Sequence, residues 1–507
     1  MRRRDVLMGL TASGIGAGMT GLPSHASEPV QAQATSFPHS TAWQLSRPKP
    51  ALANSYFWTW DHSANWVLDD PGILNFGCHN AYLKQPNTYL EDYRRLTDLA
   101  AGLGVKGIVV WGFLRDSHGG VESAKRVADY AASRGVAIMP GIGTNWYGGV
   151  YYEGNHRYNL ETFTRHNPSA CLIDANGKPD GHGACPSHPL FIEWLQEGTR
   201  WLFDEFAIGG ANLENGDFVI CHCSACKERQ GKALVGEPAF WLHQERGYQP
   251  ALKAIQGELN TKLIAWASYK GFIPGTNPTG GQDAFMECPR PSLVDRLPQG
   301  AICQWTLTSM LRQSPLPLSA YLDHGAPEEA VSGDVWTAGV RPPSKRSVGF
   351  LHQGSQWGGG LAAGGPSASR YKQIVSTIKE ACLRASREGL EGISIHGEVS
   401  SMHVPWALNY LAFSHFIHWP EDSLRAFGKK TLGAVLGSSD DGEAFAVLLA
   451  AWESHSLMPT QKTDIATRTD SLARNVSHGK DLHRYRFWRW LHAVSHDQSD
   501  PYTASIF

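Results

Sequence analysis

Short runs of apolar and β-branched residues alternate with longer amphipathic stretches from residue 55 onward. Each short run fits a buried strand, and each longer stretch repeats its apolar positions with helical spacing. The strands are predicted at 55–60, 107–111, 136–140, 210–214, 262–266, 301–305, 347–351 and 392–396. The helices between them are predicted at 88–103, 121–134, 188–206, 241–258 and 370–388. Regular alternation predicts a parallel sheet, and eight units favour a closed (β/α)8 barrel over an open sheet.

Two long segments follow the third and fifth predicted strands, at 141–187 and 270–300. Long loops in a compact domain are usually functional, and these fall at the strand ends where barrel enzymes place their sites. We therefore predict an α/β fold with a TIM barrel over 53–430 and long βα loops. A linker is expected at 27–52, and a helical C-terminal extension is expected to pack on the barrel over 431–507.

The chain begins with three consecutive arginines, a weakly apolar run and the small-residue pattern Ser24-His25-Ala26. This order resembles a twin-arginine signal peptide over 1–26. We expect the twin-arginine translocase as a partner during export, and a periplasmic or secreted mature protein. No later apolar run approaches the ~20 residues of a spanning helix, so no membrane association is expected after signal removal.

The charge and composition of the chain bear on which binding partners are expected. Net charge is −2, with 42% hydrophobic and 18% charged residues, as in an ordinary globular protein. No basic face for nucleic acid is implied, so no nucleic-acid partner is expected. The nine cysteines are an odd count and suggest no disulfide framework. No cofactor is expected.

Polar side chains follow every predicted strand, and five of the eight strand ends also carry a tryptophan. Aromatic rings stack on the apolar face of a sugar, and polar groups bind its hydroxyls. The alternative is that these tryptophans belong to the barrel core. The predicted substrate-binding residues are Trp60, His62, Trp111, Arg115, Asn145, Trp146, Asp217, Trp266, Trp305, His352, Gln353 and His396.

Glycoside hydrolysis needs two carboxyl groups beside the scissile bond. Glu214 ends an apolar strand and is the candidate general acid, and Glu398 follows the eighth strand as candidate base or nucleophile. Asp61 and Asp217 are reserves for the second role. The alternative is structural hydrogen bonding for Glu214, a salt bridge at the barrel mouth for Glu398, and hydroxyl binding or orientation of a neighbour for Asp61 and Asp217. Strands four and eight face each other across the barrel. This favours the wider separation between the two carboxyl groups that is typical of an inverting enzyme.

Two cations suggest an acidic sugar as the substrate. Arg115 and Lys270 follow predicted strands and could bind a sugar carboxylate. The alternative is that Arg115 pairs with Asp116 or Glu153 instead.

The segment Cys221-His222-Cys223-Ser224-Ala225-Cys226 is typical of a metal or redox motif. Zinc sites usually combine two paired clusters, and a second pair is missing because Cys171 and Cys185 stand apart in the sequence. A metal site completed by a remote histidine, a local disulfide and packed thiols all remain open, and no metal ligand is assigned.

Several short motifs resemble a known family. They are His166-Asn167-Pro168, Asp174-Ala175-Asn176-Gly177-Lys178, Ala184-Cys185-Pro186-Ser187-His188-Pro189, Glu214-Asn215-Gly216-Asp217 and the cysteine segment 221–226, with Gly397-Glu398-Val399, Asn409-Tyr410-Leu411 and Trp419-Pro420 further on. Together they resemble the uncharacterised domain family 4838, which is similar to family 67 α-glucuronidases and family 20 hexosaminidases. The resemblance implies a glycoside hydrolase-like barrel over about 55–440. The Asp-Glu pair of family 20 is absent on strand four, so its substrate-assisted mechanism is not implied.

The leading hypothesis is an exported glycoside hydrolase acting on an oligo- or polysaccharide. A polysaccharide lyase that uses His62, His352 or His396 for proton abstraction is one alternative. A non-catalytic sugar-binding barrel is the other.

Overall fold

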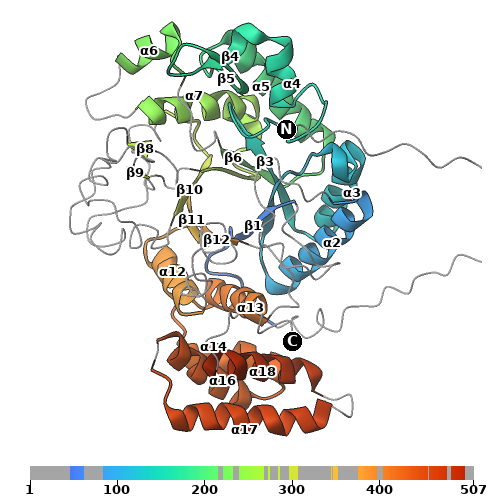
Figure 1. Ribbon diagram of the computed structural model, residues 1–507, viewed down its shortest axis with the longest axis vertical. Helices are drawn as coiled ribbons and strands as arrows, with labels where there is room; N and C mark the ends of the chain where they lie inside the picture. The colour runs from blue at the N-terminus through green and yellow to red at the C-terminus, as the bar shows by residue number, and fades with distance from the viewer. Residues whose placement is uncertain are drawn as a thin grey trace, which may run out of the picture. The chain divides into compact units, whose positions relative to one another are not determined.

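Eight parallel strands of the computed structural model close into a barrel, as the alternation of strands and helices predicted (Figure 1). The ring order is β1, β12, β11, β10, β7, β6, β3 and β2. The bounds are β1 Tyr56–Trp60, β2 Gly107–Trp111, β3 Ala137–Gly143, β6 Gly210–Glu214, β7 Leu263–Ala267, β10 Ile302–Thr306, β11 Ser347–Leu351 and β12 Gly392–His396. The structure describes residues 46–61, 84–214, 221–231, 239–267, 272–273, 284–285, 296–306, 344, 346–351, 375–396, 404–454, 456–476 and 481–496.

Four strands have the predicted bounds, and the other four differ by one to three residues at an end. The largest difference is in β3, which continues past Pro140 to Gly143. Gly141 and Gly143 keep pairing with Asn212 and Glu214 of β6. The sequence pattern missed this extension because glycine is uncommon inside strands.

Amphipathic helices connect the strands and cover the outside of the barrel (Figure 1). They include α2 Pro86–Leu103, α3 Gly120–Ser133, α5 Pro189–Glu205, α7 Ala239–Ala254 and α12 Val375–Arg387. Helix α2 begins with a proline in its first turn and ends at Gly104, which has a left-handed φ of 73°. Leu96 and Leu103 of this helix are fully buried against the barrel.

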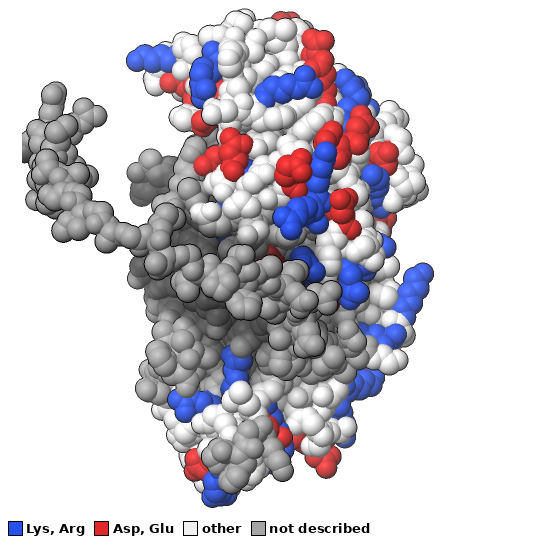
Figure 2. Space-filling model, turned by 90° about the vertical axis from the view of Figure 1, so that its right-hand side faces the viewer, with Lys and Arg blue, Asp and Glu red and all other residues white. Residues whose placement is uncertain are grey.

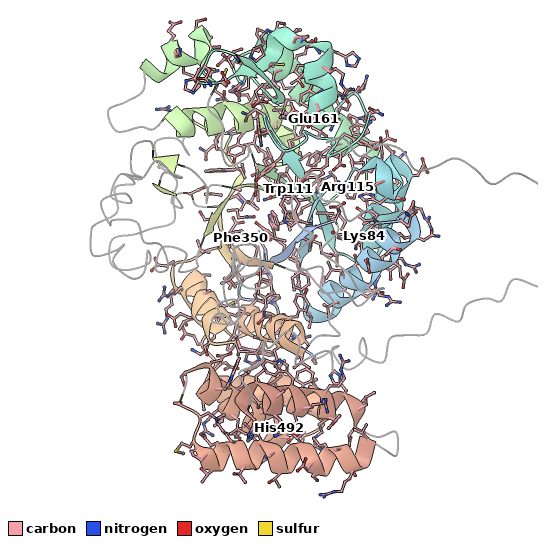
Figure 3. The ribbon with its side chains drawn as sticks, viewed as in Figure 1. Lys84, Trp111, Arg115, Glu161, Phe350 and His492 are labelled. Atoms are coloured by element: carbon pink, nitrogen blue, oxygen red, sulfur yellow. The ribbon has the colours of Figure 1, made fainter. Side chains whose placement is uncertain are left out.

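Side chains inside the barrel form a core separate from the layer between strands and helices. Tyr56, Trp58, Trp111 and Phe350 belong to this inner core, and Figure 3 shows Trp111 and Phe350 within the ring of strands. Neighbouring residues on the same strands, such as Phe57, face the helices. This alternation is the period of two expected of strands.

The segment between β3 and β6 contains structure of its own. It holds α4 Leu160–His166 and an antiparallel hairpin of β4 Cys171–Ile173 and β5 Pro179–Ala184. Asn159 caps α4 by accepting a hydrogen bond from the Thr162 backbone N–H at 3.0 Å. The predicted long insertion after the third strand is therefore an ordered subdomain beside the barrel mouth. The other predicted insertion, 270–300, lies mostly outside the described residues, which here include the short paired strands β8 Phe272–Ile273 and β9 Ala284–Phe285.

The C-terminal region is helical, as predicted. It comprises α13 Val404–His418, α14 Leu424–Phe427, the π-helical turn η5 Gly428–Leu432, α15 Gly433–Leu436, α16 Ser439–Glu453, α17 Pro459–Val476 and α18 Leu482–His496. Glu453 of α16 accepts backbone N–H bonds from Val375 and Ser376 at 3.1 and 3.2 Å. It thereby caps the start of α12 and ties the C-terminal helices to the barrel. The predicted linker also makes contacts, since the Leu52 N–H donates to Ile417 O of α13 and Arg47 Nη1 donates to Gly102 O of α2 at 2.8 Å.

Acidic and basic side chains are interspersed on the face shown in Figure 2. Between α2 and α3, for example, Arg134 Nε lies 2.9 Å from Asp98 Oδ1. Among the described residues, no helix combines the length and the apolar character that crossing a membrane requires.

Candidate active site

Glu214 is the last residue of β6 and is only 4% exposed at the C-terminal end of the barrel. Ala211 and Leu213 of this strand pack in the outer layer, whereas Asn212 is bonded to the indole of Trp111 inside the barrel. Glu214 shares the inward parity of Asn212. The strand therefore directs the Glu214 carboxyl group into the mouth of the barrel.

A hydrogen-bonded group of side chains fills the barrel below Glu214. Trp58 and Trp111 both donate their indole N–H to Asn212 Oδ1, at 3.3 and 3.0 Å. Asn212 donates in turn to Gln304 Oε1 at 3.1 Å, which also accepts from the Tyr56 hydroxyl at 2.7 Å. Trp111 was expected to stack on a sugar, but it is fully buried and belongs to this core. The alternative considered for the tryptophans, a role in the core, is correct for Trp111.

Asp61 and Arg115 form a buried ion pair beside the first two strands. Arg115 Nε lies 2.7 Å from Asp61 Oδ2, and both residues are 2% exposed. Arg115 also pairs with the half-exposed Glu153 and lies over the ring of Tyr152. Burial opposes the charge of Arg115, but the charge of Asp61, its hydrogen bond and Glu153 together raise the pKa of the guanidinium above its ordinary value. The predicted alternative, pairing of Arg115 with Glu153, is thus confirmed.

This pairing bears on two predicted roles. The carboxylate of Asp61 pairs with Arg115 and lies 3.4 Å from His118 Nε2, and its predicted role as a reserve catalytic carboxylate stays a prediction. Arg115 is held by two carboxylates and so offers no unpaired cation to an acidic sugar.

Gly112 makes this ion pair possible. It follows β2 with a left-handed φ of 84°, and a Cβ there would lie 2.4 Å from Asp61 Cγ. Its carbonyl is hydrogen-bonded to His118 Nε2 at 2.8 Å. His118 itself stacks on Tyr89 with ring centroids 3.8 Å apart. Only a glycine leaves room for the Asp61 carboxylate at this turn.

Two tyrosines, Tyr147 and Tyr152, extend the aromatic core of the barrel toward its C-terminal end. Tyr147 is partly exposed, and its ring centroid lies 6.4 Å from that of Trp60 and 5.9 Å from that of Trp111. Tyr152 contacts the same two indoles at 6.1 and 6.3 Å. Trp60, a predicted sugar platform, is 3% exposed and is covered by these tyrosines. Tyr147 is therefore the aromatic residue of this group that reaches solvent most readily.

The loop that carries Tyr147 is tightly folded. Tyr147 has a left-handed φ of 59°, unusual for a residue other than glycine. A Cβ on Gly143 would lie 2.2 Å from the carbonyl oxygens of Trp146 and Tyr147. The loop thus folds back directly over the end of β3, beside Glu214. Local strain of this kind often accompanies functional loops.

Asn145 supplies a buried polar group near Glu214. It is 1% exposed, and its side-chain Nδ2 has no hydrogen-bond partner among the described residues. The preceding residue, Thr144, donates its N–H to Glu214 O at 2.7 Å. A buried amide group without a protein partner can donate a hydrogen bond to a substrate hydroxyl or to an ordered water. Asn145 was predicted to bind substrate, and its position is compatible with that role.

Two other predicted tryptophans pack outside the barrel interior. Trp266 faces the helical layer, where its ring lies 5.6 Å from that of Tyr248 of α7. The strand parity turns it outward, so it is not a wall of the mouth. Trp146 is partly exposed and lies against the β4–β5 hairpin, where a Cβ on Gly183 would come within 2.6 Å of its ring.

The remaining predictions fall outside the described side chains. These residues are His62, Asp217, Lys270, Trp305, His352, Gln353, His396 and Glu398. Their predicted roles stay predictions.

A pocket of about 400 Å³ lies at the opposite end of the barrel. Its lining includes Lys106, Val136, Gly209 and Lys262, each of which precedes a barrel strand. This is the end at which barrel enzymes do not place their active sites. It is therefore not the candidate site.

A group of four cysteines was missed by the sequence analysis. Cys185 was expected to stand apart, but its Sγ lies 3.6 Å from Cys223 Sγ and 3.7 Å from Cys226 Sγ. With Cys221, these residues form the one described group of His, Cys, Asp or Glu side chains with the proximity needed to hold a metal ion. The hairpin of β4 and β5 brings Cys185 to the other three, which spacing alone did not reveal.

Comparison with known proteins adds solved structures of low similarity. No protein-family model matches the sequence, and no curated protein matches it. Similar solved structures include a GH138 enzyme targeting pectin rhamnogalacturonan II, with 10% identity, 80% of this chain and 54% of that chain covered, and a TM-score of 0.44. A β-N-acetylhexosaminidase from Bacteroides fragilis is 14% identical over 51% of this chain and 46% of that chain, with a TM-score of 0.31. An α-amylase from Lactobacillus plantarum is 11% identical over 68% of this chain and 71% of that chain, with a TM-score of 0.38.

The chain spans about half of the length of the first two of these structures. The resemblance to domain family 4838 and to families 67 and 20 stays a prediction. Function is therefore inferred from the geometry of the barrel mouth.

Proposed function

We propose that this chain is a glycoside hydrolase in which Glu214 is the general acid. The observation that carries the proposal is the placement of Glu214: a nearly buried carboxyl group at the C-terminal end of an inner barrel strand. Active sites of (β/α)8 barrels form at this end. A carboxyl group at this position can protonate the leaving oxygen of a glycoside bound at the barrel mouth.

The surroundings of Glu214 fit a sugar. Tyr147 presents a partly exposed ring above the indole of Trp60, suited to the apolar face of a pyranose. Asn145 offers a buried amide donor for a hydroxyl group. The filled barrel below means that substrate binds above the level of Asn212 and Gln304.

Glu398 is proposed as the second carboxylate because it follows β12 in the sequence. Strands β6 and β12 occupy opposite positions in the ring of eight. Carboxyl groups on opposite walls favour the separation of roughly 6.5–9.5 Å that admits a water molecule and inverts the anomeric configuration. Because Arg115 is already paired, the proposal does not extend to an acidic sugar. Export by the twin-arginine route, with a periplasmic or secreted location, is proposed from residues 1–26 alone.

The test uses the purified full chain on a panel of aryl glycosides and polysaccharides, with the first-formed anomer read by NMR. Glu214→Gln is expected to lower kcat by about 10²–10⁴-fold on substrates with poor leaving groups, and less on nitrophenyl glycosides, which need little protonation. Glu205→Gln, a surface carboxylate of α5 paired with Lys125, should leave kcat unchanged.

Three outcomes would overturn the proposal. Wild-type turnover by Glu214→Gln on both substrate classes would remove Glu214 from the reaction. An unsaturated, ultraviolet-absorbing product would identify a polysaccharide lyase. Retention on polysaccharide without product from either protein would identify a sugar-binding barrel.

A further inference from the structure

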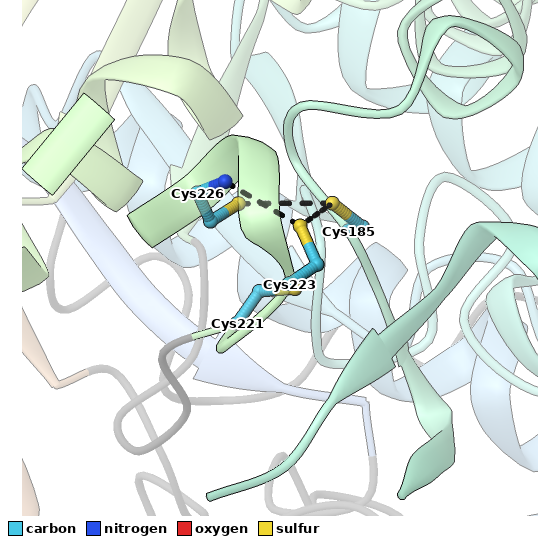
Figure 4. A group of neighbouring side chains, drawn as sticks. All are labelled: Cys185, Cys221, Cys223 and Cys226. Atoms are coloured by element: carbon cyan, nitrogen blue, oxygen red, sulfur yellow. Dashed lines mark hydrogen bonds between the residues drawn. The ribbon is translucent and has the colours of Figure 1, made fainter. Parts of the chain in front are cut away.

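Four cysteine side chains converge beside the barrel, outside the candidate active site (Figure 4). Cys185 lies between the β4–β5 hairpin and α5, whereas Cys221, Cys223 and Cys226 lie at the start of α6 Ser224–Gly231. Their Sγ atoms all lie within 4.8 Å of one another. Two segments distant in sequence thus contribute to one compact group of sulfurs.

The distances between these sulfurs do not fit disulfides. The Sγ of Cys185 lies 3.6 Å from that of Cys223 and 3.7 Å from that of Cys226. A disulfide needs about 2.05 Å, and all four cysteines are free. A zinc ion with four Zn–S bonds of about 2.3 Å holds its sulfurs about 3.8 Å apart at tetrahedral angles. The observed spacing therefore matches four ligands around a single ion.

The surroundings are those of a closed site. Cys221 and Cys226 are fully buried, Cys185 is 4% exposed, and Cys223 is partly buried. Four protein ligands leave no open position for a substrate, as in structural rather than catalytic zinc sites. Leu172 and Ile173 of the hairpin cover the group on one side.

Hydrogen bonds to the sulfurs favour thiolates. The backbone N–H of Ile173 donates to Cys221 Sγ at 3.4 Å, and that of Cys226 donates to Cys223 Sγ at 3.4 Å. Ser187 Oγ lies 3.2 Å from Cys226 Sγ and accepts a hydrogen bond from Arg229 Nη1 at 2.8 Å. Such outer contacts orient metal ligands. Four thiolates carry more negative charge than a zinc ion carries positive charge, and the nearby guanidinium of Arg229 offsets part of this excess.

We propose that Cys185, Cys221, Cys223 and Cys226 bind one structural Zn²⁺ ion. The ion ties the β4–β5 hairpin to the start of α6. Cys221 follows Glu214 closely in the sequence, so the site lies a short distance along the chain from the proposed general acid. Binding releases the thiol protons to solvent as the four Zn–S bonds form, with no change in oxidation state.

The first experiment measures metal in the full chain purified under reducing conditions without chelator. Elemental analysis is expected to find one zinc per chain. Replacement of zinc by Co²⁺ should give the strong visible absorption of a tetrahedral thiolate site, together with thiolate-to-cobalt charge transfer in the near ultraviolet. These readouts use the wild-type chain and do not depend on any variant folding.

The second experiment uses variants. Cys223→Ser replaces the most exposed of the four residues and should lower zinc content to well below half an equivalent. Cys171→Ser is the matched control, because Cys171 lies on the same hairpin with its Sγ 3.8 Å from Thr164 O and is not one of the four. It should retain one zinc per chain.

The proposal fails if the reduced wild-type chain binds no zinc and gives no cobalt spectrum. It also fails if iron occupies the site at one equivalent, or if mass spectrometry of the freshly purified chain finds a disulfide among the four cysteines. Loss of zinc from Cys171→Ser to the same extent as from Cys223→Ser would likewise overturn it.

Discussion

The guanidinium of Arg115 makes two hydrogen bonds to the carboxylate of Asp61, with Nε 2.7 Å from Oδ2 and Nη2 3.3 Å from Oδ1. Removing one partner of such a buried pair leaves an uncompensated charge, which typically costs about 3–5 kcal/mol. Arg115→Met is therefore expected to lower the free energy of unfolding by about this amount, measured by urea denaturation. Combining it with Asp61→Leu should recover part of the loss, because no buried charge then remains unpaired and Glu153 is partly exposed to water. A loss below about 1 kcal/mol for Arg115→Met would contradict this account.

Gly112 is expected to be intolerant of a side chain. Gly112→Ala combines an unfavourable φ of 84° with a Cβ placed 2.4 Å from Asp61 Cγ. Gly135 is the matched control, since its φ of 71° is similar and nothing lies within 4 Å of a Cβ there. Gly135→Ala should cost about 1 kcal/mol from backbone strain alone. Gly112→Ala should cost clearly more, and equal urea midpoints for the two variants would show that the contact with Asp61 is unimportant.

Asn212 is expected to hold the tryptophans of the barrel interior in place. Its Oδ1 accepts both indole N–H bonds, so Asn212→Leu leaves two buried donors without their acceptor. Each such donor costs about 1–3 kcal/mol. The urea midpoint should fall, and the near-ultraviolet circular dichroism of the tryptophans should change. Adding Trp111→Phe removes one of the two indole N–H donors that Asn212→Leu leaves without an acceptor. The double variant should therefore lose less stability than the sum of the losses of the two single variants.

Acid sensitivity is expected to arise partly from His415. Burial lowers the pKa of this residue to about 4, with Lys430 and Arg47 lowering it further and Asp422 opposing them. Below its ordinary pKa of 6.5, the unfolded chain binds a proton that the folded chain does not. This contribution to stability is present above about pH 6.5 and is lost as pH falls toward 4, by up to about 3 kcal/mol.

The measurement compares unfolding free energies at pH 7.5 and pH 5 for the wild type and His415→Asn. The variant should lose less stability on acidification than the wild type does. Parallel losses would show that His415 does not contribute, and that the other buried histidines whose pKa values burial lowers, such as His418, account for the pH dependence.

The barrel could be predicted from the sequence because its strands are short apolar runs bounded by polar residues. The direction of each tryptophan was harder to predict. Trp60 and Trp266 both stand near strand ends, but Trp60 faces inward and Trp266 faces the helices. A shift of one residue in the pairing register of a strand reverses this direction, and the sequence does not show the register directly. The predicted β7 differed from the observed strand by one residue.

The partners of charged side chains were equally hard to foresee. Glu153 was considered as a partner of Arg115, but Asp61, 54 positions away in the sequence, was not. Cys185 lies close to the other three cysteines only because the intervening hairpin and helix bring it there. Such pairings depend on tertiary structure, which residue spacing does not encode.

The hydrogen bond from Asn212 to Gln304 lies in the barrel interior, and the described side chains of Tyr56, Trp58 and Trp111 fill the space around it. In the proposed hydrolase, a glycan therefore enters and leaves by the end that bears Glu214. Product must depart along the route by which substrate arrived, or sideways across the rim. Repeated cleavage of a long polysaccharide would require the polymer to lie across that rim. The loops, and not the strands, would then determine the path of the polymer.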